Sequence, residues 1–323
     1  MDSPYSPLEF SLLNEWQHAF PLVSRPFDTI GAKVGADGTA VLATLQRLNA
    51  RGAISRIGPV FAPRRVGAGA LAAVAAPAER LEEVAARISA DPQVNHNYQR
   101  EHEFNLWFVV TAADEAARAA ALTGIERDTG CAVIAMPLRH EFHIDLGFDL
   151  RSGHTASPRR VAVAAEVRAL TDDERALAAL VQTGISICEQ PYAELASRLG
   201  QSERWVLGRL AKWCDEGLIK RFGVVVRHHE LGYRANAMVV FDIADGDVEQ
   251  VGTLLAAEPG VTLCYCRERC LPDWRHNLYC MVHGRNREDV APQIARLAQL
   301  AGAEPTVLFS LRRFKQCGAR YFA

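Results

Sequence analysis

The sequence contains no apolar run of about 18 residues, which is the length that a membrane-spanning helix requires. Its first residues, MDSPYSPLEF, lack a basic segment followed by an apolar core, so we expect no signal peptide and a cytoplasmic protein. The formal net charge is only −2. A surface that is basic throughout, as general nucleic-acid binders have, is therefore excluded, although a local basic patch is compatible with this charge.

The eight cysteines do not follow a standard metal-binding spacing. Cys264, Cys266 and Cys270 form a C-x-C-x3-C pattern with Cys280 further on, and a zinc or iron–sulfur site is one interpretation. Zinc ribbons, however, use paired C-x2-C units. Cys264 and Cys266 would also share one face of a strand, where cysteine packs as a small apolar residue. We therefore expect free thiols and no metal ligands from the protein.

The chain repeats itself. Residues 51–58, RGAISRIG, align with residues 216–223, EGLIKRFG, and the same spacing places Gly67 on Gly232. The spacing drifts further along, as short loop insertions would cause. The sequence thus predicts a tandem duplication of units of about 150 residues, each large enough for two small domains.

Each half begins with a helical pattern. In the second half, Thr171 opens a capping box, Pro191 starts a second helix, and Ser202 caps a third helix that Gly217 ends. A strand pattern follows at 218–227. The first half repeats this order more loosely, with predicted helices at 12–20, 27–34 and 39–48. Three short helices and a strand are typical of a winged helix-turn-helix.

The remainder of each half alternates strand and helix in the order βαββαβ, which is ferredoxin-like. The predicted strands lie at 70–76, 94–100, 104–111 and 131–142, and at 235–243, 261–267, 276–283 and 305–314; the predicted helices lie at 79–89, 114–127, 246–257 and 287–300. The predicted fold class is α+β. Its domains are a winged helix-turn-helix at 1–66, a ferredoxin-like domain at 67–150, a polar linker at 151–167, a second winged helix-turn-helix at 168–231 and a second ferredoxin-like domain at 232–323.

One strand of the first half carries polar side chains on a single face. At a period of two, Val94, His96, Tyr98, Arg100 and His102 point to the same side. This face is either a solvated outer surface or a binding site for a polar ligand, because such groups are costly to bury without partners. The second half repeats the pattern with Tyr265, Arg267 and Arg269. That recurrence favours the ligand site.

A winged helix-turn-helix joined to a βαββαβ domain resembles the Lrp/AsnC regulators, and EGLIKRF at 216–222 occupies the place of their helix-to-wing signature. The resemblance implies DNA binding as one function. Base-reading helices should offer Arg, Lys, Asn or Gln. The helix at 38–49 offers only Gln46, Arg47 and Asn49, and the cations of the next copy are offset by acidic neighbours. We therefore expect no nucleic-acid partner; a DNA-binding regulator and a tetrapyrrole sensor are the alternatives.

The segment HNYQREHEFNLWF at 96–108 is more specific, since it resembles the signature of the siroheme decarboxylases of haem d1 and alternative haem biosynthesis. The second half, with LPDW at 271–274 and NLYCMVHG at 277–284, resembles their partner subunit, so the chain is similar to a NirDL-type fusion. The resemblance implies non-oxidative removal of the C12 and C18 acetate carboxylates of siroheme. It implies no cofactor, because the iron belongs to the substrate.

Siroheme is a flat macrocycle edged by carboxylates, so its site needs arginines, aromatic surface and a proton donor. A structural role is the alternative for each histidine, and His143 could instead bind the substrate iron. Leu263 replaces the histidine in the second half, which predicts a single working site. We expect siroheme as the ligand, an internal pseudo-dimer packed sheet to sheet, and further association with a second copy or related subunits. The predicted catalytic residues are His96, Tyr98, Arg100 and His102, and the predicted substrate-binding residues are Trp107, His140, His143, Tyr265, Arg267, Arg269, Tyr279, His283, Arg312, Arg313 and Lys315.

Overall fold

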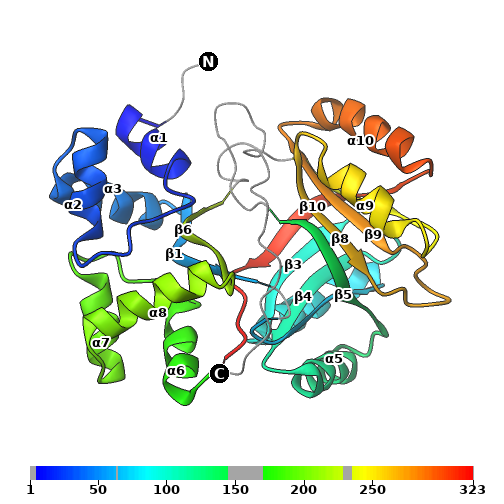
Figure 1. Cartoon of the computed structure of the whole chain (residues 1–323). Coiled ribbons are helices and arrows are strands. Elements are labelled where there is room, and N and C mark those ends of the chain that lie inside the picture. Colours follow the sequence, from blue (N-terminus) through cyan, green and yellow to red (C-terminus); the bar gives the residue numbers. More distant parts are fainter. Residues whose placement is uncertain (1–4, 63–64, 145–169, 228–234, 323) are drawn as a thin grey trace. The chain divides into compact units, whose positions relative to one another are not determined.

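The computed structural model describes residues 5–62, 65–144, 170–227 and 235–322 (Figure 1). The predicted linker at 151–167 lies outside these residues. The chain divides into two compact units, of which the first comprises residues 1–66, 160–231 and 320–323 and the second comprises residues 67–159 and 232–319. Each unit therefore combines corresponding segments of both halves. None of the helices in the described part of the chain has the length and apolar composition needed to cross a bilayer.

The first unit contains the six helices expected from the two helix-turn-helix patterns. They are α1 (Pro7–Asn14), α2 (Pro26–Val34), α3 (Gly38–Ala50), α6 (Asp172–Val181), α7 (Pro191–Leu199) and α8 (Glu203–Asp215). Local signals set most of their ends: Thr171 forms a capping box with Glu174, and Gly200 ends α7 in the left-handed conformation. The prediction for the first helix was wrong, because Ser6 and Glu9 form a capping box that starts α1 well before Leu12.

The strands that follow these helices pair with each other across the two halves. Strand β1 (Ile54–Phe61) runs antiparallel to β6 (Ile219–Val226), with Gly58 opposite Gly223. These two glycines also correspond in the sequence repeat, so the pseudo-twofold axis of the duplication passes near them. A Cβ on Gly223 would lie 2.1 Å from the Gln17 carbonyl oxygen, so this position requires glycine.

The second unit has the order β-α-β-β-α-β in each half, as the sequence predicted. A short 3-10 helix, Ala78–Arg80, precedes α4. The elements of the first half are β2 (Ala68–Val74), α4 (Leu81–Ala90), β3 (Val94–Arg100), β4 (Leu106–Ala112), α5 (Glu115–Thr129) and β5 (Val133–Ile144). Those of the second half are β7 (Ala235–Phe241), α9 (Val248–Ala256), β8 (Val261–Arg267), β9 (Leu278–Gly284), α10 (Arg287–Ala301) and β10 (Thr306–Gln316).

The strands of both halves close into one barrel with the order β10-β3-β4-β2-β5-β8-β9-β7. Two long strands join the halves. Strand β5 pairs with β2 of its own half and continues along β8 of the other, and β10 pairs with β7 of its own half and continues along β3. The two sheets therefore face each other and also share hydrogen-bonded edges, which leaves no open edge among these strands.

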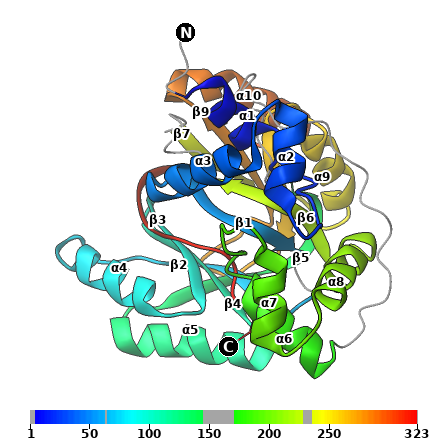
Figure 2. The same cartoon turned by 90° about the vertical axis from the view of Figure 1, so that its left-hand side faces the viewer.

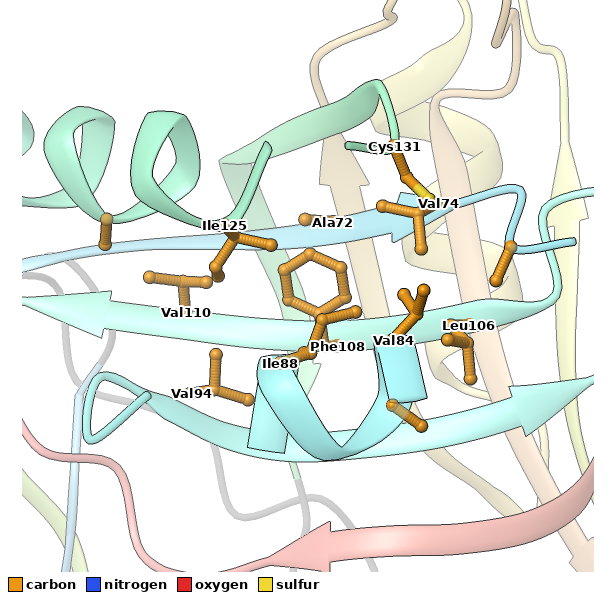
Figure 3. Packing of buried hydrophobic residues seen from close by; sticks show 13 residues of the cluster. Ala72, Val74, Val84, Ile88, Val94, Leu106, Phe108, Val110, Ile125 and Cys131 are labelled. Atoms are coloured by element: carbon orange, nitrogen blue, oxygen red, sulfur yellow. The ribbon is translucent and has the colours of Figure 1, made fainter. Parts of the chain in front are cut away.

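The barrel strands bury side chains on both faces. On the outer face, Val84 and Ile88 of α4 pack on Phe108 and Val110 of β4 (Figure 3), and an equivalent cluster lies beneath α9 and α10. Helices α4 and α5, labelled in Figure 2, pack on the strands of their own half. The inner face carries a third cluster, which includes Trp107, Met136, Trp274, Tyr279 and Leu308. Both halves contribute to it, so the barrel interior is their shared core.

Candidate active site

The polar face predicted for β3 lies on the inside of the barrel. Tyr98 is opposite Trp107 in the β3–β4 register, and His96 is opposite Val109. Both β4 residues belong to or pack against the inner cluster. The alternate residue Asn97 points outward and donates its side-chain amide to Ala85 of α4. The period of two directs His96, Tyr98 and Arg100 inward, so this face is not a solvated outer surface. The prediction that Val94 shares the face was wrong, because the register shifts between Val94 and His96 and Val94 packs in the outer cluster.

Arg100 is buried and has no acidic partner among the residues that the structure describes. Its side chain is only 7% exposed, and Nη1 donates to the Leu308 carbonyl oxygen at 2.8 Å. Its Nε has no hydrogen-bond partner within the described chain. Burial lowers the pKa of Arg100 to about 10, so the guanidinium still carries its charge at neutral pH. An unpaired buried cation is costly, and a carboxylate from a ligand would offset that cost.

Arg267 of β8 repeats this arrangement in the second half. Its Nη1 donates to the Met136 carbonyl oxygen at 3.2 Å, and its Nε also has no partner within the described chain. The guanidinium carbon lies 5.1 Å from the ring centre of Tyr265 and 5.7 Å from that of Tyr279. Arg100 is similarly placed 5.7 Å from the ring centre of Tyr98. Each arginine thus donates to a joining strand of the opposite half.

The phenol of Tyr98 is neutral at physiological pH. Burial raises its pKa, and the charges of Arg100 and Arg313 act in the opposite direction. Arg313 of β10 lies opposite Tyr98 in the strand register, so it shares the inner face with Arg100. The rings of His96 and Tyr98 are stacked with their centres 6.2 Å apart. A hydroxyl donor, an imidazole and two guanidinium groups are therefore gathered around one strand.

His96 is held from one side by its neighbour in sequence. Its Nδ1 lies 2.5 Å from the Asn95 side-chain oxygen, and Asn95 Nδ2 donates to Thr111 Oγ1 at 3.1 Å. Contact between Asn95 and this histidine could not be expected from the sequence, because neighbouring residues of a regular strand point to opposite faces.

His102 lies past the end of β3 and has a different environment. Its Nδ1 accepts the Phe104 backbone N–H at 3.0 Å, so the ring proton of the neutral form is on Nε2. Burial lowers its pKa. The ring centre is 5.4 Å from that of Trp274, a buried residue of the second half. His102 is therefore a neutral N–H donor at pH 7 rather than an imidazolium.

Trp274 brings a second histidine to this end of the barrel. The His276 ring centre is 4.6 Å from that of Trp274, and its Nε2 is 3.0 Å from Thr306 Oγ1. Burial lowers the pKa of His276 to about 4. Trp274 Nε1 donates to the Tyr279 hydroxyl, which donates to the His276 carbonyl oxygen. Neither Trp274 nor His276 was predicted as a site residue, although both adjoin the LPDW and NLYCMVHG segments.

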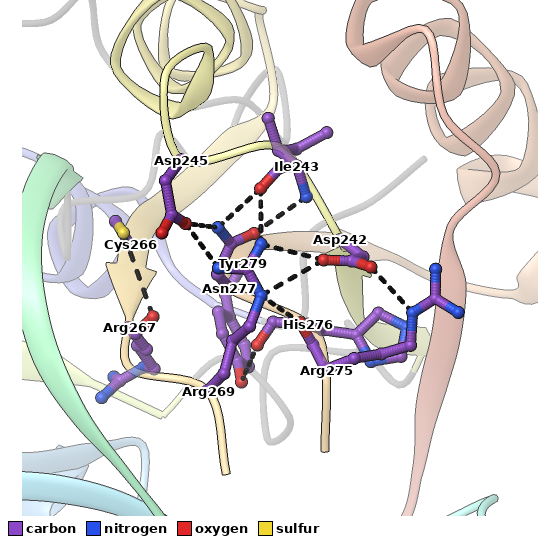
Figure 4. Close-up of polar contacts among 10 residues, drawn as sticks. All are labelled: Asp242, Ile243, Asp245, Cys266, Arg267, Arg269, Arg275, His276, Asn277 and Tyr279. Carbon is purple, nitrogen blue, oxygen red and sulfur yellow. Dashed lines mark hydrogen bonds and ion pairs between the residues drawn. The ribbon is translucent and has the colours of Figure 1, made fainter. Parts of the chain in front are cut away.

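Three of the predicted substrate-binding cations are engaged elsewhere. Figure 4 shows Arg269 paired with Asp242 and Asp245, whereas the Arg267 guanidinium lies apart from that network. Arg312 pairs with Glu82 of α4 and lies over the Phe314 ring on the outer face. Lys315 donates to the Ser89 and Asp91 carbonyl oxygens at the end of α4. These contacts stabilise loops and helix ends.

The remaining predicted histidines have other partners. His140 contacts the ring of Phe142, which packs on the cluster beneath α9, and His143 lies opposite Cys264. His283 is held between Asn236 and Thr262. The cysteines are free thiols, and no three His, Cys, Asp or Glu side chains among the described residues are arranged to hold a metal.

The comparison with known proteins identifies the family. The AsnC-like ligand binding domain family matches residues 65–143 and 230–315, and the siroheme decarboxylase NirDL-like HTH domain family matches residues 9–54 and 174–220. The siroheme decarboxylase NirDL subunit of Paracoccus denitrificans is 40% identical over 319 residues, which cover 97% of this chain and 96% of that protein. The chain belongs to the NirDL siroheme decarboxylase family. Its α+β fold therefore holds HTH and AsnC-like ligand-binding domains in tandem.

Two further relatives of the NirDL family bear on the site. The crystal structure of the siroheme decarboxylase NirDL in co-complex with an iron-uroporphyrin III analogue matches with a TM-score of 0.70 and 28% identity, covering 98% of this chain and 95% of that one. The siroheme decarboxylase NirD subunit of Stutzerimonas stutzeri is 50% identical over 139 residues, covering 43% of this chain and 91% of that subunit. A protein of half this length therefore exists separately in the same family.

In this NirDL family member the two halves of the barrel carry different charges at corresponding positions. Arg313 of β10 lies opposite Tyr98, whereas Glu141 of β5 lies opposite Tyr265. Leu263 also occupies the position that corresponds to His96. The inner surface near β3 is consequently cationic and contains an imidazole. The equivalent surface near β8 carries Arg267 and the Glu141 carboxylate, and it lacks that imidazole.

Proposed function

We propose that the chain is an enzyme that removes the acetate carboxylates at C12 and C18 of siroheme, without an oxidant, to give 12,18-didecarboxysiroheme in haem d1 biosynthesis. Among the residues of this chain, Arg100 gives the main support for the proposal. It is a buried guanidinium on the inner face, with no acidic partner among the described residues and with aromatic surface beside it. Such a group matches a flat ligand edged by carboxylates. Membership of the NirDL family supports the same substrate.

The proposed architecture has a winged helix-turn-helix and a ferredoxin-like domain in each half, with the two halves acting as an internal pseudo-dimer. The shared barrel supports this proposal, since β5 and β10 each contribute to the other half. A second copy or a separate related subunit would be a further partner, as the existence of a half-length family member suggests.

Decarboxylation of an acetate on a pyrrole ring requires an acceptor for the electron pair of the breaking bond. Protonation of the adjacent ring carbon makes the macrocycle that acceptor, and carbon dioxide leaves as the carbon–carbon bond breaks. The exocyclic methylene then takes a proton to become the methyl group, and the ring proton is returned. Each event consumes one proton and no electrons, so the protein must supply a proton donor and hold the carboxylate in place.

His96 is the proposed proton donor, because its ring stacks with Tyr98, which Arg313 faces across the strand register, and its Nδ1 contacts Asn95. Arg100 and Arg313 are the proposed carboxylate ligands, with Tyr98 as a neutral hydroxyl donor. Trp107 supplies part of the apolar surface. His102, held as a neutral N–H donor, would orient substrate rather than protonate it.

The proposed working site is in the first half. Siroheme brings several negative charges, which Arg100 and Arg313 attract, whereas Glu141, opposite Tyr265 in the β5–β8 register, would repel them. Arg267 remains available to bind a carboxylate at the distal edge of a ligand. The second half would then position the substrate without carrying out chemistry.

The helix-turn-helix segments give little support to a DNA-binding function. Of the three cations on α8, Arg209 pairs with the buried Glu174 and Lys212 pairs with Glu216. On α3, the Gln46 amide donates to the Ile187 carbonyl oxygen and Arg47 contacts Thr44. Groups already engaged within the protein must break those contacts to read base edges.

The experiment that tests the function is anaerobic incubation of the purified protein with siroheme. We expect a shift of the visible spectrum on binding, followed by release of two carbon dioxide molecules per siroheme. Binding without release would favour a tetrapyrrole sensor. Sequence-selective binding to duplex DNA at physiological salt, with no uptake of siroheme, would overturn the proposal in favour of a regulator.

A further inference from the structure

We propose that Asn95 is a positioning residue that fixes the tautomer and direction of the His96 ring. The role assigned to His96 rests on the proposed function, but the contact between the two side chains stands on its own. The Asn95 side chain lies between His96 and Thr111 and joins them by hydrogen bonds. The inference follows from the backbone register, the orientation of the amide and a comparison with the second half.

A β-bulge makes the contact between the two side chains possible. In the β3–β4 register, Val94 is opposite Val110 and His96 is opposite Val109, so Asn95 is the extra residue on β3. A bulge turns consecutive side chains away from strict alternation, and bulges often occur beside active sites. The Asn95 carbonyl oxygen accepts the Cys317 backbone N–H at 2.8 Å, which secures the bulge against the segment after β10. Asn95 can thus reach the ring of the next residue.

The Asn95 amide contacts Thr111 at one end and His96 at the other. Its NH₂ group donates to Thr111 Oγ1 at 3.1 Å, and its oxygen faces His96 Nδ1 at 2.5 Å. A carbonyl oxygen only accepts, and therefore in this arrangement Nδ1 carries a proton in both charge states of the ring. Asn95 is 2% exposed and Thr111 is 3% exposed, so solvent does not compete for these contacts. In that tautomer the proton that the proposed donor gains and loses is the one on Nε2.

The second half shows that the bulge does not by itself require asparagine. There, Val261 is opposite Val282 and Leu263 is opposite Met281, so Thr262 is the extra residue. The same backbone irregularity is therefore formed around a buried threonine, whose hydroxyl contacts His283. Where the next residue is leucine, no ring needs to be oriented. The amide at position 95 accompanies the histidine at position 96.

Beside a histidine that donates a proton, the neutral amide oxygen of Asn95 is a better hydrogen-bond acceptor than a carboxylate would be. A carboxylate near an imidazole commonly raises the histidine pKa by about 1–3 units. It would then hold the imidazolium too firmly for transfer to a ring carbon near pH 7. The amide of Asn95 orients the ring without adding charge. Asn95→Asp should therefore shift the pH dependence, and Asn95→Leu should remove the orientation.

Two measurements test the proposal. The first is ¹⁵N NMR of the histidine rings in the ligand-free protein, with His96 assigned by its loss in His96→Gln. We expect neutral His96 to carry its proton on Nδ1 in the parent, and Asn95→Leu to give a mixture or the Nε2-protonated form. The second is the pH profile of siroheme turnover. We expect the alkaline limb to move upward by about 1 unit or more in Asn95→Asp.

In Asn95→Leu we expect kcat to fall about 10- to 100-fold with little change in KM, since orientation acts on the chemical step. Thr262→Val is the matched control at the equivalent bulge and should leave both parameters unchanged. An unaltered His96 tautomer in Asn95→Leu would overturn the proposal, as would a kcat loss equal to that of Thr262→Val. The NMR result does not depend on siroheme, so failure of the proposed enzymatic function is distinguishable from failure of this inference.

Discussion

Replacing Arg100 by leucine is expected to weaken siroheme binding about 10- to 150-fold without unfolding the protein. Arg100 is charged at neutral pH, since its pKa is lowered only to about 10. A hydrogen bond to a charged group contributes about 1.5–3 kcal/mol, and each 1.4 kcal/mol is about tenfold in Kd. This estimate counts one arginine–carboxylate contact, because Arg313 would still bind the ligand.

The folded protein should tolerate the Arg100→Leu change. Losing the donor leaves the Leu308 carbonyl oxygen without its partner, which costs about 1–3 kcal/mol. Removing a buried cation that has no acidic partner offsets part of that cost. Arg100→Lys keeps the charge but lacks the planar fork, and its affinity should fall between those of the parent and the leucine variant.

The assay is an anaerobic absorbance titration of siroheme, combined with thermal unfolding of the ligand-free variants. Arg296→Met is the control, because Arg296 lies on α10 and pairs with Glu258 at the protein surface. A parent-like Kd of Arg100→Leu for siroheme would show that Arg100 binds no siroheme carboxylate. A loss of affinity in Arg296→Met equal to that in Arg100→Leu would refute the assignment as well.

Three further predictions concern the donor, the pH range and the core. His96→Ala should bind siroheme but lose about 10²- to 10⁴-fold in kcat, and normal turnover would place the acid elsewhere. Because burial lowers the pKa of His276 to about 4 in the folded protein, His276 binds a proton at higher pH in the unfolded state than in the folded state. The urea midpoint should therefore fall as pH drops from 6.5 toward 4, and less so in His276→Asn. Phe108→Ala, in the outer cluster, should lower the free energy of unfolding by about 3–5 kcal/mol. A decrease below about 1 kcal/mol in equilibrium unfolding would contradict this prediction.

Short-range patterns in the sequence determined the element order and most helix ends. Capping residues such as Thr171 and Ser202 act within one turn, and Gly200 acts through its own backbone, so their effects can be read locally. The same reasoning misplaced the bounds of α1, because the capping box of Ser6 lies in a segment whose apolar pattern is weak. The internal repeat was visible because both halves keep the same local signals.

The alternation of polar residues along β3 also identified His96, Tyr98 and Arg100 as one face, since strand geometry alone imposes that period. Which cations remained available for a ligand depended on distant partners. Arg269 meets Asp242 and Arg312 meets Glu82, and neither pairing follows from spacing along the chain. The sequence alone therefore could not show that Arg269 and Arg312 are paired with carboxylates of the protein.

Only the tertiary structure decided how the two halves share a barrel and what holds the proposed donor. The exchange of β5 and β10 between the halves brings Arg313 beside Tyr98 and Glu141 beside Tyr265. The bulge at Asn95 depends on how β3 pairs with β4, which is a property of two strands together. Residue types and their period are fixed by the chain itself, whereas register, strand exchange and ion pairing arise when segments distant in sequence meet.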